Sequence, residues 1–245
     1  MTNITLQFNR KDLQFKQDGN LSKAAVTIYA RVTSMARRMV NVFEDVVTIE
    51  VPSELLQQAS AGASIYQKAV PLPPGMYRLN VVAKDIVGGN MINYALALNV
   101  PRMDEDQLFA SSLVLADVLE KVPTRSIGTG QFVIGSSKVR PRVGEGFKQN
   151  EKMGIYMKLY NFQADEKTNK PHGQVEYEIV KSSDQSKVLE FTEDLSSLEG
   201  SASQLTIEKL LPLQNMAPGQ YTLRLKVTDK LKNKTLTQSA QFSIS

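Results

Sequence analysis

Apolar and polar residues alternate with a period of two along most of the chain. In one stretch, Tyr77, Leu79 and Val81 alternate with Arg78 and Asn80. A half-buried antiparallel strand produces this pattern, because its successive side chains face the core and the solvent in turn. The pattern predicts strands near residues 4–16, 24–34, 40–51, 64–71, 76–85 and 91–100, and again near 131–140, 153–162, 174–181, 187–192, 204–211, 220–229 and 235–244.

One stretch occurs twice. PPGMYRLNVVAKD (73–85) returns as APGQYTLRLKVTD (217–229), with the Pro-Gly, the tyrosine, one leucine and the final aspartate unchanged. A tyrosine placed two residues after a Pro-Gly turn can pack its ring inward and bond a backbone group of the preceding loop, as in the tyrosine corner of immunoglobulin-like sandwiches. We therefore interpret Tyr77 and Tyr221 as scaffold residues, because catalysis by both would require two equivalent sites.

The segments around the repeat are also alike. Each copy leads into turn formers, Gly88-Gly89-Asn90 or Asn233, and then into another alternating strand, which indicates two hairpins. Upstream, two further pairs of segments resemble each other: IYQKAVPL (65–72) with TIEKLLPL (206–213), and VTIYARV (26–32) with MGIYMKL (153–159). The repeat thus covers most of each half of the chain.

The expected fold is all-β, with two tandem immunoglobulin-like or fibronectin-like β-sandwich domains. We expect the first domain at 1–103 and the second at 131–245, with 104–130 as a linker that can supply the first strand of domain 2. Residues 108–122 fit either an amphipathic helix or a buried strand, and the surrounding β-structure favours the strand. SELLQQAS (53–60) is interpreted as one helical turn with Ser53 as its cap.

Charge and composition point away from nucleic acid as a partner. The 245 residues are 42% hydrophobic and 22% charged, with a net charge of +4, which is typical of a folded protein. The densest basic group, Lys138, Arg140 and Arg142, alternates with apolar residues and is interpreted as an exposed strand face. A phosphate or anionic-lipid contact there is the less favoured alternative.

Few residues are suited to catalysis or metal binding. The chain has no cysteine and one histidine, His172, which follows Pro171 in the polar loop 161–174 and is expected to be a surface residue. The glycines of GTGQFVIG (128–135) precede a strand rather than open a helix, and MDEDQ (103–107) lacks EF-hand spacing. We therefore predict no catalytic, cofactor-binding or metal-binding residue and no cofactor.

The N-terminal residues MTNITLQFNRKDLQF alternate and do not resemble a signal peptide. Apolar runs fall far short of the roughly 18 residues that cross a bilayer, so no transmembrane segment is expected. An export signal, if the protein is exported, is expected upstream of this chain.

Several long segments resemble the C-terminal region of GWxTD-domain proteins from Acidobacteria. They include VTIYARVTS, SIYQKAVPLPPGMYRLNVVAKDIVGGN, GIYMKLYNFQADEKTNKP and the stretch from PRMDEDQLF to VRPRV. The Gly-Trp-x-Thr-Asp motif itself is absent, because the chain contains no tryptophan, so the resemblance is to the β-rich region that follows the naming domain. It implies a bacterial, exported protein of the periplasm or cell envelope. No activity is established for the family, so no functional residue is transferred, and a cytoplasmic location stays open.

The expected function is a non-catalytic interaction or spacer module of a larger envelope-associated protein, with protein partners. Binding would use the loops at the sandwich ends, of which 161–174 is the natural candidate, or a free sheet edge. For that loop itself, a solvated hairpin end is the favoured interpretation. The alternative is a carbohydrate-binding or accessory module of an exported hydrolase, which would use surface tyrosines such as Tyr160. A catalytic domain is the least favoured class, and the oligomeric state is left open.

Overall fold

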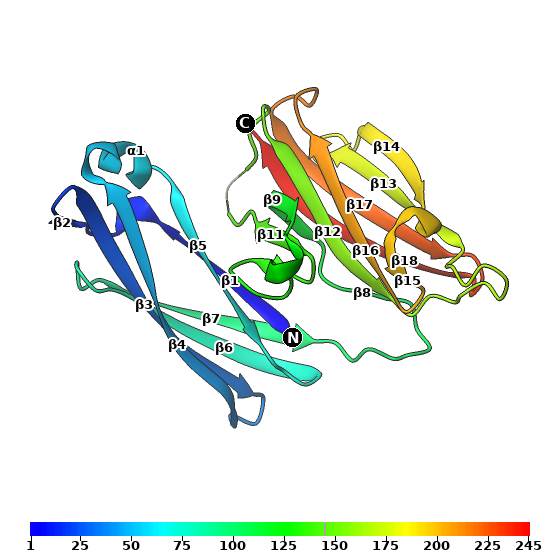
Figure 1. Ribbon diagram of the computed structural model, residues 1–245, viewed down its shortest axis with the longest axis horizontal. Coiled ribbons are helices and arrows are strands. Elements are labelled where there is room, and N and C mark those ends of the chain that lie inside the picture. Colours follow the sequence, from blue (N-terminus) through cyan, green and yellow to red (C-terminus); the bar gives the residue numbers. More distant parts are fainter. Residues whose placement is uncertain (145) are drawn as a thin grey trace. The chain divides into compact units, whose positions relative to one another are not determined.

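The structure is a computed structural model that describes residues 1–144 and 146–245. The chain divides into two compact units, unit 1 (Met1–Arg102) and unit 2 (Met103–Ser245). In each unit, two antiparallel sheets pack face to face around a hydrophobic core (Figure 1). The predicted all-β sandwich fold is confirmed.

The larger sheet of unit 1 is built around β3 and β6, which pair with each other, with β4 on the far side of β3 and β7 on the far side of β6. The short strand β2 pairs with the start of β3, and the smaller sheet is formed by β1 and β5. The elements are β1 (Thr2–Asn9), η1 (Arg10–Asp12), β2 (Lys16–Asp18), β3 (Leu21–Ser34), β4 (Met39–Pro52), η2 (Ser53–Leu55), α1 (Leu56–Ser60), β5 (Ala63–Val70), β6 (Gly75–Asp85) and β7 (Met91–Val100).

Unit 2 repeats this plan and adds strands to its second sheet. Its first sheet has the order β14-β13-β17-β18, and its second has the order β10-β11-β9-β12-β16-β15, with β8 also paired to β12. The elements are β8 (Phe109–Ala110), β9 (Val114–Lys121), η3 (Thr124–Ser126), β10 (Val133–Ile134), β11 (Ser137–Pro141), β12 (Lys152–Tyr160), β13 (Gly173–Lys181), β14 (Lys187–Asp194), η4 (Leu195–Ser197), β15 (Glu199–Ser201), β16 (Gln204–Pro212), β17 (Gly219–Asp229) and β18 (Lys234–Ile244).

The repeated sequence forms β6 in unit 1 and β17 in unit 2. β6 lies between β3 and β7, and β17 lies between the equivalent strands β13 and β18. The final aspartates of the repeat, Asp85 and Asp229, bond the backbone N–H groups of Gln14 and Gln163, which follow β1 and β12. The strands β1 and β12 are therefore equivalent, as are their partners β5 and β16.

One predicted correspondence is wrong. IYQKAVPL and TIEKLLPL lie on the equivalent strands β5 and β16, but VTIYARV lies on β3 and MGIYMKL on β12. The strands β3 and β12 belong to different sheets of the sandwich. Both are central strands with a buried face, and burial selects similar residues without requiring equivalent positions.

The predicted strand within 108–122 is confirmed, because β8 and β9 occupy this segment and pair antiparallel with β12. The predicted strand 4–16 is interrupted by the turn η1. SELLQQAS is helical, as η2 and α1, but the proposed cap at Ser53 is wrong. The Ser53 hydroxyl instead lies 2.9 Å from the hydroxyl of Ser22, a residue buried on β3.

The tyrosine corner is present in both units. The hydroxyl of Tyr77 donates a hydrogen bond to the carbonyl of Pro73 at 2.8 Å, and that of Tyr221 donates to the carbonyl of Ala217 at 2.6 Å. Both rings are buried in their cores. The two tyrosines therefore fix the turn that leads into the central strand, as the sequence predicts.

Candidate interaction surface

The described residues contain no group of three or more histidine, cysteine, aspartate or glutamate side chains that could hold a metal ion. His172 is exposed, as expected from the sequence, and its carbonyl accepts a hydrogen bond from the backbone N–H of Lys230 at 2.9 Å. The acidic stretch at Asp104 forms an exposed turn, in which its carboxylate accepts the backbone N–H of Asp106. His172 is thus a surface residue, and Asp104 belongs to an exposed turn.

The polar loop 161–174 is held by its own hydrogen bonds. The carboxylate of Asp165 accepts the backbone N–H groups of Thr168 and Lys167, and the Thr168 hydroxyl as well, which lowers the pKa of Asp165. An isolated β-bridge between Ala164 and Pro171 closes the loop. This geometry is that of a hairpin end, and a partner contact through it stays a prediction.

The basic group on β11 and directly after it is neutralised by acidic neighbours. Arg140 bonds Asp117 at 2.7 Å and Arg142 bonds Glu151 at 2.7 Å, beside a shallow hollow of about 530 Å³. Burial raises the pKa of Glu151, but hydrogen bonds from the backbone N–H of Lys148 and from Arg142 outweigh it, so the net shift is downward. Because these cations already have carboxylate partners, the hollow offers little free charge to a phosphate.

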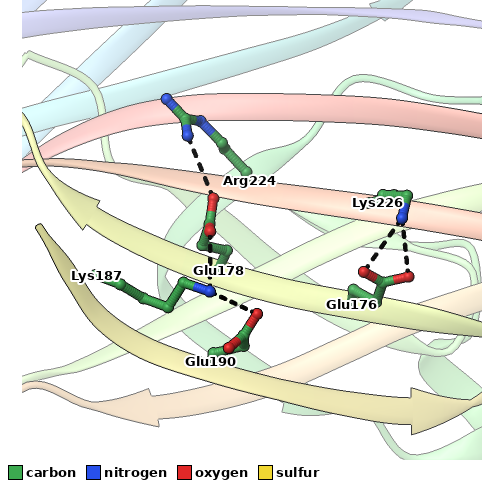
Figure 2. A network of polar contacts seen from close by, with 6 residues as sticks. All are labelled: Glu176, Glu178, Lys187, Glu190, Arg224 and Lys226. Carbon is green, nitrogen blue, oxygen red and sulfur yellow. Dashed lines mark hydrogen bonds and ion pairs between the residues drawn. The ribbon is translucent and has the colours of Figure 1, made fainter. Parts of the chain in front are cut away.

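A charged network covers the outer face of the sheet formed by β13, β14 and β17 (Figure 2). Its members are Glu176, Glu178, Lys187, Glu190, Arg224 and Lys226. Lys226 lies 3.2 Å from Glu176, and Arg224 lies 3.2 Å from Glu178. Their side chains are partly exposed, so water screens these pairs and each contributes little free energy. Since positive and negative groups alternate, this face is an ordinary solvated sheet surface.

A row of large apolar side chains on β7 is exposed. Ile92, Tyr94 and Leu96, here called the β7 row, keep 65%, 61% and 43% of their surface accessible. In the β6–β7 register they lie opposite Ala83, Val81 and Leu79. Those three residues are buried in the core of unit 1. The β7 row therefore projects from the core-facing side of its sheet but is not covered there.

The equivalent positions in unit 2 are filled differently. On β18, Leu236, Gln238 and Ala240 occupy the places of Ile92, Tyr94 and Leu96, as shown by the matching register of β17 with β18 and of β6 with β7. All three are partly buried. Unit 2 thus shields the smaller and more polar row, whereas unit 1 leaves the larger apolar row in contact with solvent.

The difference has a simple structural cause. In unit 2, β8 and β9 pair with β12, and β8 lies against β18. In unit 1, β1 is the equivalent of β12, and it pairs with β5 on one edge. In the part of the chain that the structure describes, no strand pairs with the other edge of β1. Within the described residues, no strand of unit 1 takes the position over the β7 row that β8 takes in unit 2.

The β7 row was not predicted from the sequence, although a free sheet edge was one of the expected binding modes. Two signals were available. Residues 91–100 contain no charged residue, and the first half of the chain predicts fewer strands than the second. Alternation alone could not show the exposure, because it marks the side of a strand that faces the core and not whether a second sheet lies over it.

The tyrosine chosen as an example of a carbohydrate contact is placed otherwise. Tyr160 is half-buried, its ring lies 6.1 Å from that of Phe109, and burial raises its pKa. Tyr160 is therefore only partly accessible beside β8, and a carbohydrate contact through it stays a prediction. Tyr94 and Tyr29 are the large exposed aromatic residues of the described chain.

Within the described ranges, no helix is both long enough and apolar enough to cross a membrane.

Comparisons with known proteins give only distant structural likeness. No protein-family model matches the sequence, and no curated protein matches it. Matches among solved structures include the red sea bream transglutaminase, at 8% identity and a TM-score of 0.30 over 99% of this chain and 29% of that one. A DUF3823 family protein from Bacteroides ovatus shares 12% identity at a TM-score of 0.29, over 89% of this chain and 88% of that one. The β-glucuronidase of Parabacteroides merdae shares 11% identity at a TM-score of 0.29, over 91% of this chain and 26% of that one.

Proposed function

We propose that the chain is a non-catalytic module that binds a protein partner, as part of a larger, exported protein of a bacterial envelope. The single observation that carries the interaction is the β7 row, in which Ile92, Tyr94 and Leu96 project side by side from one strand into solvent. Single exposed apolar residues are common on protein surfaces, but a contiguous group of large ones is typical of an interaction site. The envelope location rests on the resemblance to GWxTD-domain proteins.

A protein partner fits the β7 row better than a sugar does. Carbohydrate sites combine an aromatic ring with hydrogen-bonding groups around it, whereas Tyr94 has the aliphatic neighbours Ile92 and Leu96 on its face. Burial of apolar area favours protein association by about 25 cal/mol for each Å² removed from water, before the costs of ordering are subtracted. The β7 row therefore lacks the hydrogen-bonding neighbours that a carbohydrate contact at Tyr94 would need.

The non-catalytic part of the proposal is supported by the state of the polar groups. Arg140 and Arg142 are held in ion pairs, and the carboxylate of Asp165 is held in a turn. A broad hydrolase screen checks this part, and turnover that one carboxylate substitution abolishes would contradict it.

Site-specific photocross-linking tests the interaction. A photoreactive amino acid replaces Tyr94 in cells of the source organism, and a matched variant carries it at Val46, which is 58% exposed and lies on the opposite side of the same sheet. We expect a defined partner to cross-link at position 94 only, and the purified partner to bind the purified chain. Equal cross-linking at both positions, or specific binding to a glycan array in place of a protein, would overturn the proposal.

A further inference from the structure

We propose that the β7 row is covered by an extended strand of a protein partner, which pairs antiparallel with the outer edge of β1. This inference rests on the proposed interaction function and names the form of its ligand. In this mode of recognition, backbone hydrogen bonds to a sheet edge supply affinity and alternate side chains supply specificity.

Unit 2 contains a template for such a complex. Along β12, the equivalent of β1, β9 pairs Leu115 with Ile155 and β8 pairs Ala110 with Leu159, both antiparallel. Ala110 belongs to the core of unit 2, and Leu115 packs against that core. A strand in this position therefore completes the second sheet and also covers the edge of the first one.

Charge separates the proposed edge from the sheet edges at β4 and β14. β1 (TNITLQFN) and β7 (MINYALALNV) contain no charged residue, whereas β4 carries Glu44 and Glu50, and β14 carries Lys187 and Glu190. Natural proteins protect edge strands from further pairing with charges, prolines or short length. The two unprotected strands lie on the same side of unit 1. In unit 2, β18, the equivalent of β7, contacts β8, the strand beside β12, which is the equivalent of β1.

The partner segment must do two things: pair with the free edge of β1 and cover the β7 row. The β7 row faces across the sandwich, so pairing β7 with a second copy of itself would extend the sheet and leave the row uncovered. A strand on β1 meets both needs, since its backbone pairs with β1 and every second side chain points toward Tyr94 and Leu96. We expect a segment of about the length of β1, with apolar residues at alternate positions on one face.

Selection from a displayed library of random peptides, with the full chain as the target, tests this form of ligand. We expect enriched sequences in which apolar residues recur at every second position. Methylation of the backbone nitrogen, introduced one position at a time into a synthetic copy of an enriched peptide, is expected to weaken binding at alternate positions only. That readout reports strand pairing and would not respond to a purely apolar contact.

The repeat supplies the variants for the binding measurement. The double variant Tyr94→Gln/Leu96→Ala installs the residues that β18 has at these places, Gln238 and Ala240. We expect it to weaken peptide binding about tenfold or more, because two large apolar contacts are lost. The matched control, Val46→Gln, removes an exposed apolar side chain on the other side of the sheet and is expected to leave binding unchanged.

Several results would overturn the inference. They are the absence of enriched peptides, an apolar period of three to four residues as in a helix, insensitivity to backbone methylation, or equal loss in the control variant. A dimer in solution that the double variant converts to a monomer would assign the surface to a second copy. If photocross-linking at position 94 still captures a defined partner in any of these cases, the proposed function stands and only the strand mode fails.

Discussion

The carboxylate of Asp85 accepts a hydrogen bond from the backbone N–H of Gln14 at 2.8 Å, so the end of the repeated segment is tied to the chain that leaves β1. Its other oxygen accepts the N–H of Val87 in the hairpin turn at 3.0 Å. Asp229 bonds Gln163 in the same way at 3.0 Å. Because both aspartates are buried, the repeat keeps them to satisfy backbone donors and not to present a charge.

Replacement of Asp85 by alanine is expected to lower the free energy of unfolding of unit 1 by about 2–4 kcal/mol. The change leaves two backbone N–H groups of the loop without their acceptor, and each lost charged hydrogen bond costs on the order of 1–3 kcal/mol. Amide hydrogen exchange, read separately in the two units, measures the loss and should leave unit 2 unchanged. Asp229→Ala should show the reverse pattern.

The matched control for this prediction is Asp184→Ala. Asp184 accepts hydrogen bonds from Ser186 in an exposed turn, so water can replace them and the effect should stay within about 0.5 kcal/mol. An equally large loss of unfolding free energy in Asp184→Ala would show that the burial of Asp85 does not determine the effect of its replacement.

Removal of the corner hydroxyl by Tyr77→Phe or Tyr221→Phe is expected to cost about 0.5–1.5 kcal/mol in the corresponding unit. Each variant keeps the buried ring but deprives one carbonyl, of Pro73 or Ala217, of its donor. Urea unfolding followed by circular dichroism measures the change. Tyr29→Phe, at an exposed tyrosine of β3, should be neutral, and a destabilised control would argue against a corner-specific role.

Exchange of residues between the two edge strands is expected to have opposite consequences in the two units. Tyr94→Gln/Leu96→Ala should change the stability of unit 1 by less than about 0.5 kcal/mol, because these side chains are exposed. The reciprocal Gln238→Tyr/Ala240→Leu should destabilise unit 2 by about 1–3 kcal/mol, because larger side chains must fit where β8 and β18 are in contact. Thermal unfolding of the variants tests this, and a stabilised unit 2 would mean that the site has spare room.

Most of the fold could be predicted from the sequence, because strands with one buried face leave a period-two pattern. The repeat also located equivalent strands, since Tyr77 and Tyr221 hold the same place in each unit. The false match of β3 with β12 shows the limit of this reasoning. A strand's pattern records burial, whereas its place in a sheet depends on long-range pairing that single segments do not encode.

The candidate site could not be predicted in the same way. Ile92, Tyr94 and Leu96 have the pattern of core residues, and they are exposed because no strand of the described residues lies over them. The lack of charge in residues 91–100 fits a partner surface, but it fits a covered strand equally well. The ion pairs that neutralise Arg140 and Arg142 were equally hidden, because their acidic partners, Asp117 and Glu151, lie on other segments.

Acid is expected to destabilise unit 1 in part through Asp45. The Tyr66 hydroxyl donates to its carboxylate at 2.5 Å and Lys68 lies at 2.9 Å, and these contacts lower the pKa of Asp45 below its ordinary value. A lowered pKa in the folded state gives stability that is present above the unfolded pKa of about 3.9 and is lost as the pH falls through the folded pKa. Asp45→Asn should therefore flatten the dependence of the unfolding free energy on pH between about 5 and 2. Glu44→Gln, on the opposite face of β4, is the control and should keep the original slope.

The charged network on the outer face of unit 2 is expected to couple only weakly and to respond to salt. Lys226 and Glu176 face each other across β17 and β13 at 3.2 Å, with side chains that are about half and one-third exposed. A double-mutant cycle with Lys226→Ala and Glu176→Ala should give a coupling energy of about 0.2–1 kcal/mol at low salt. The coupling should shrink at 1 M salt, where charges are screened beyond about 3 Å. A larger coupling that persists in high salt would mean that the pair is shielded from water, and would make this face a second candidate for a partner contact.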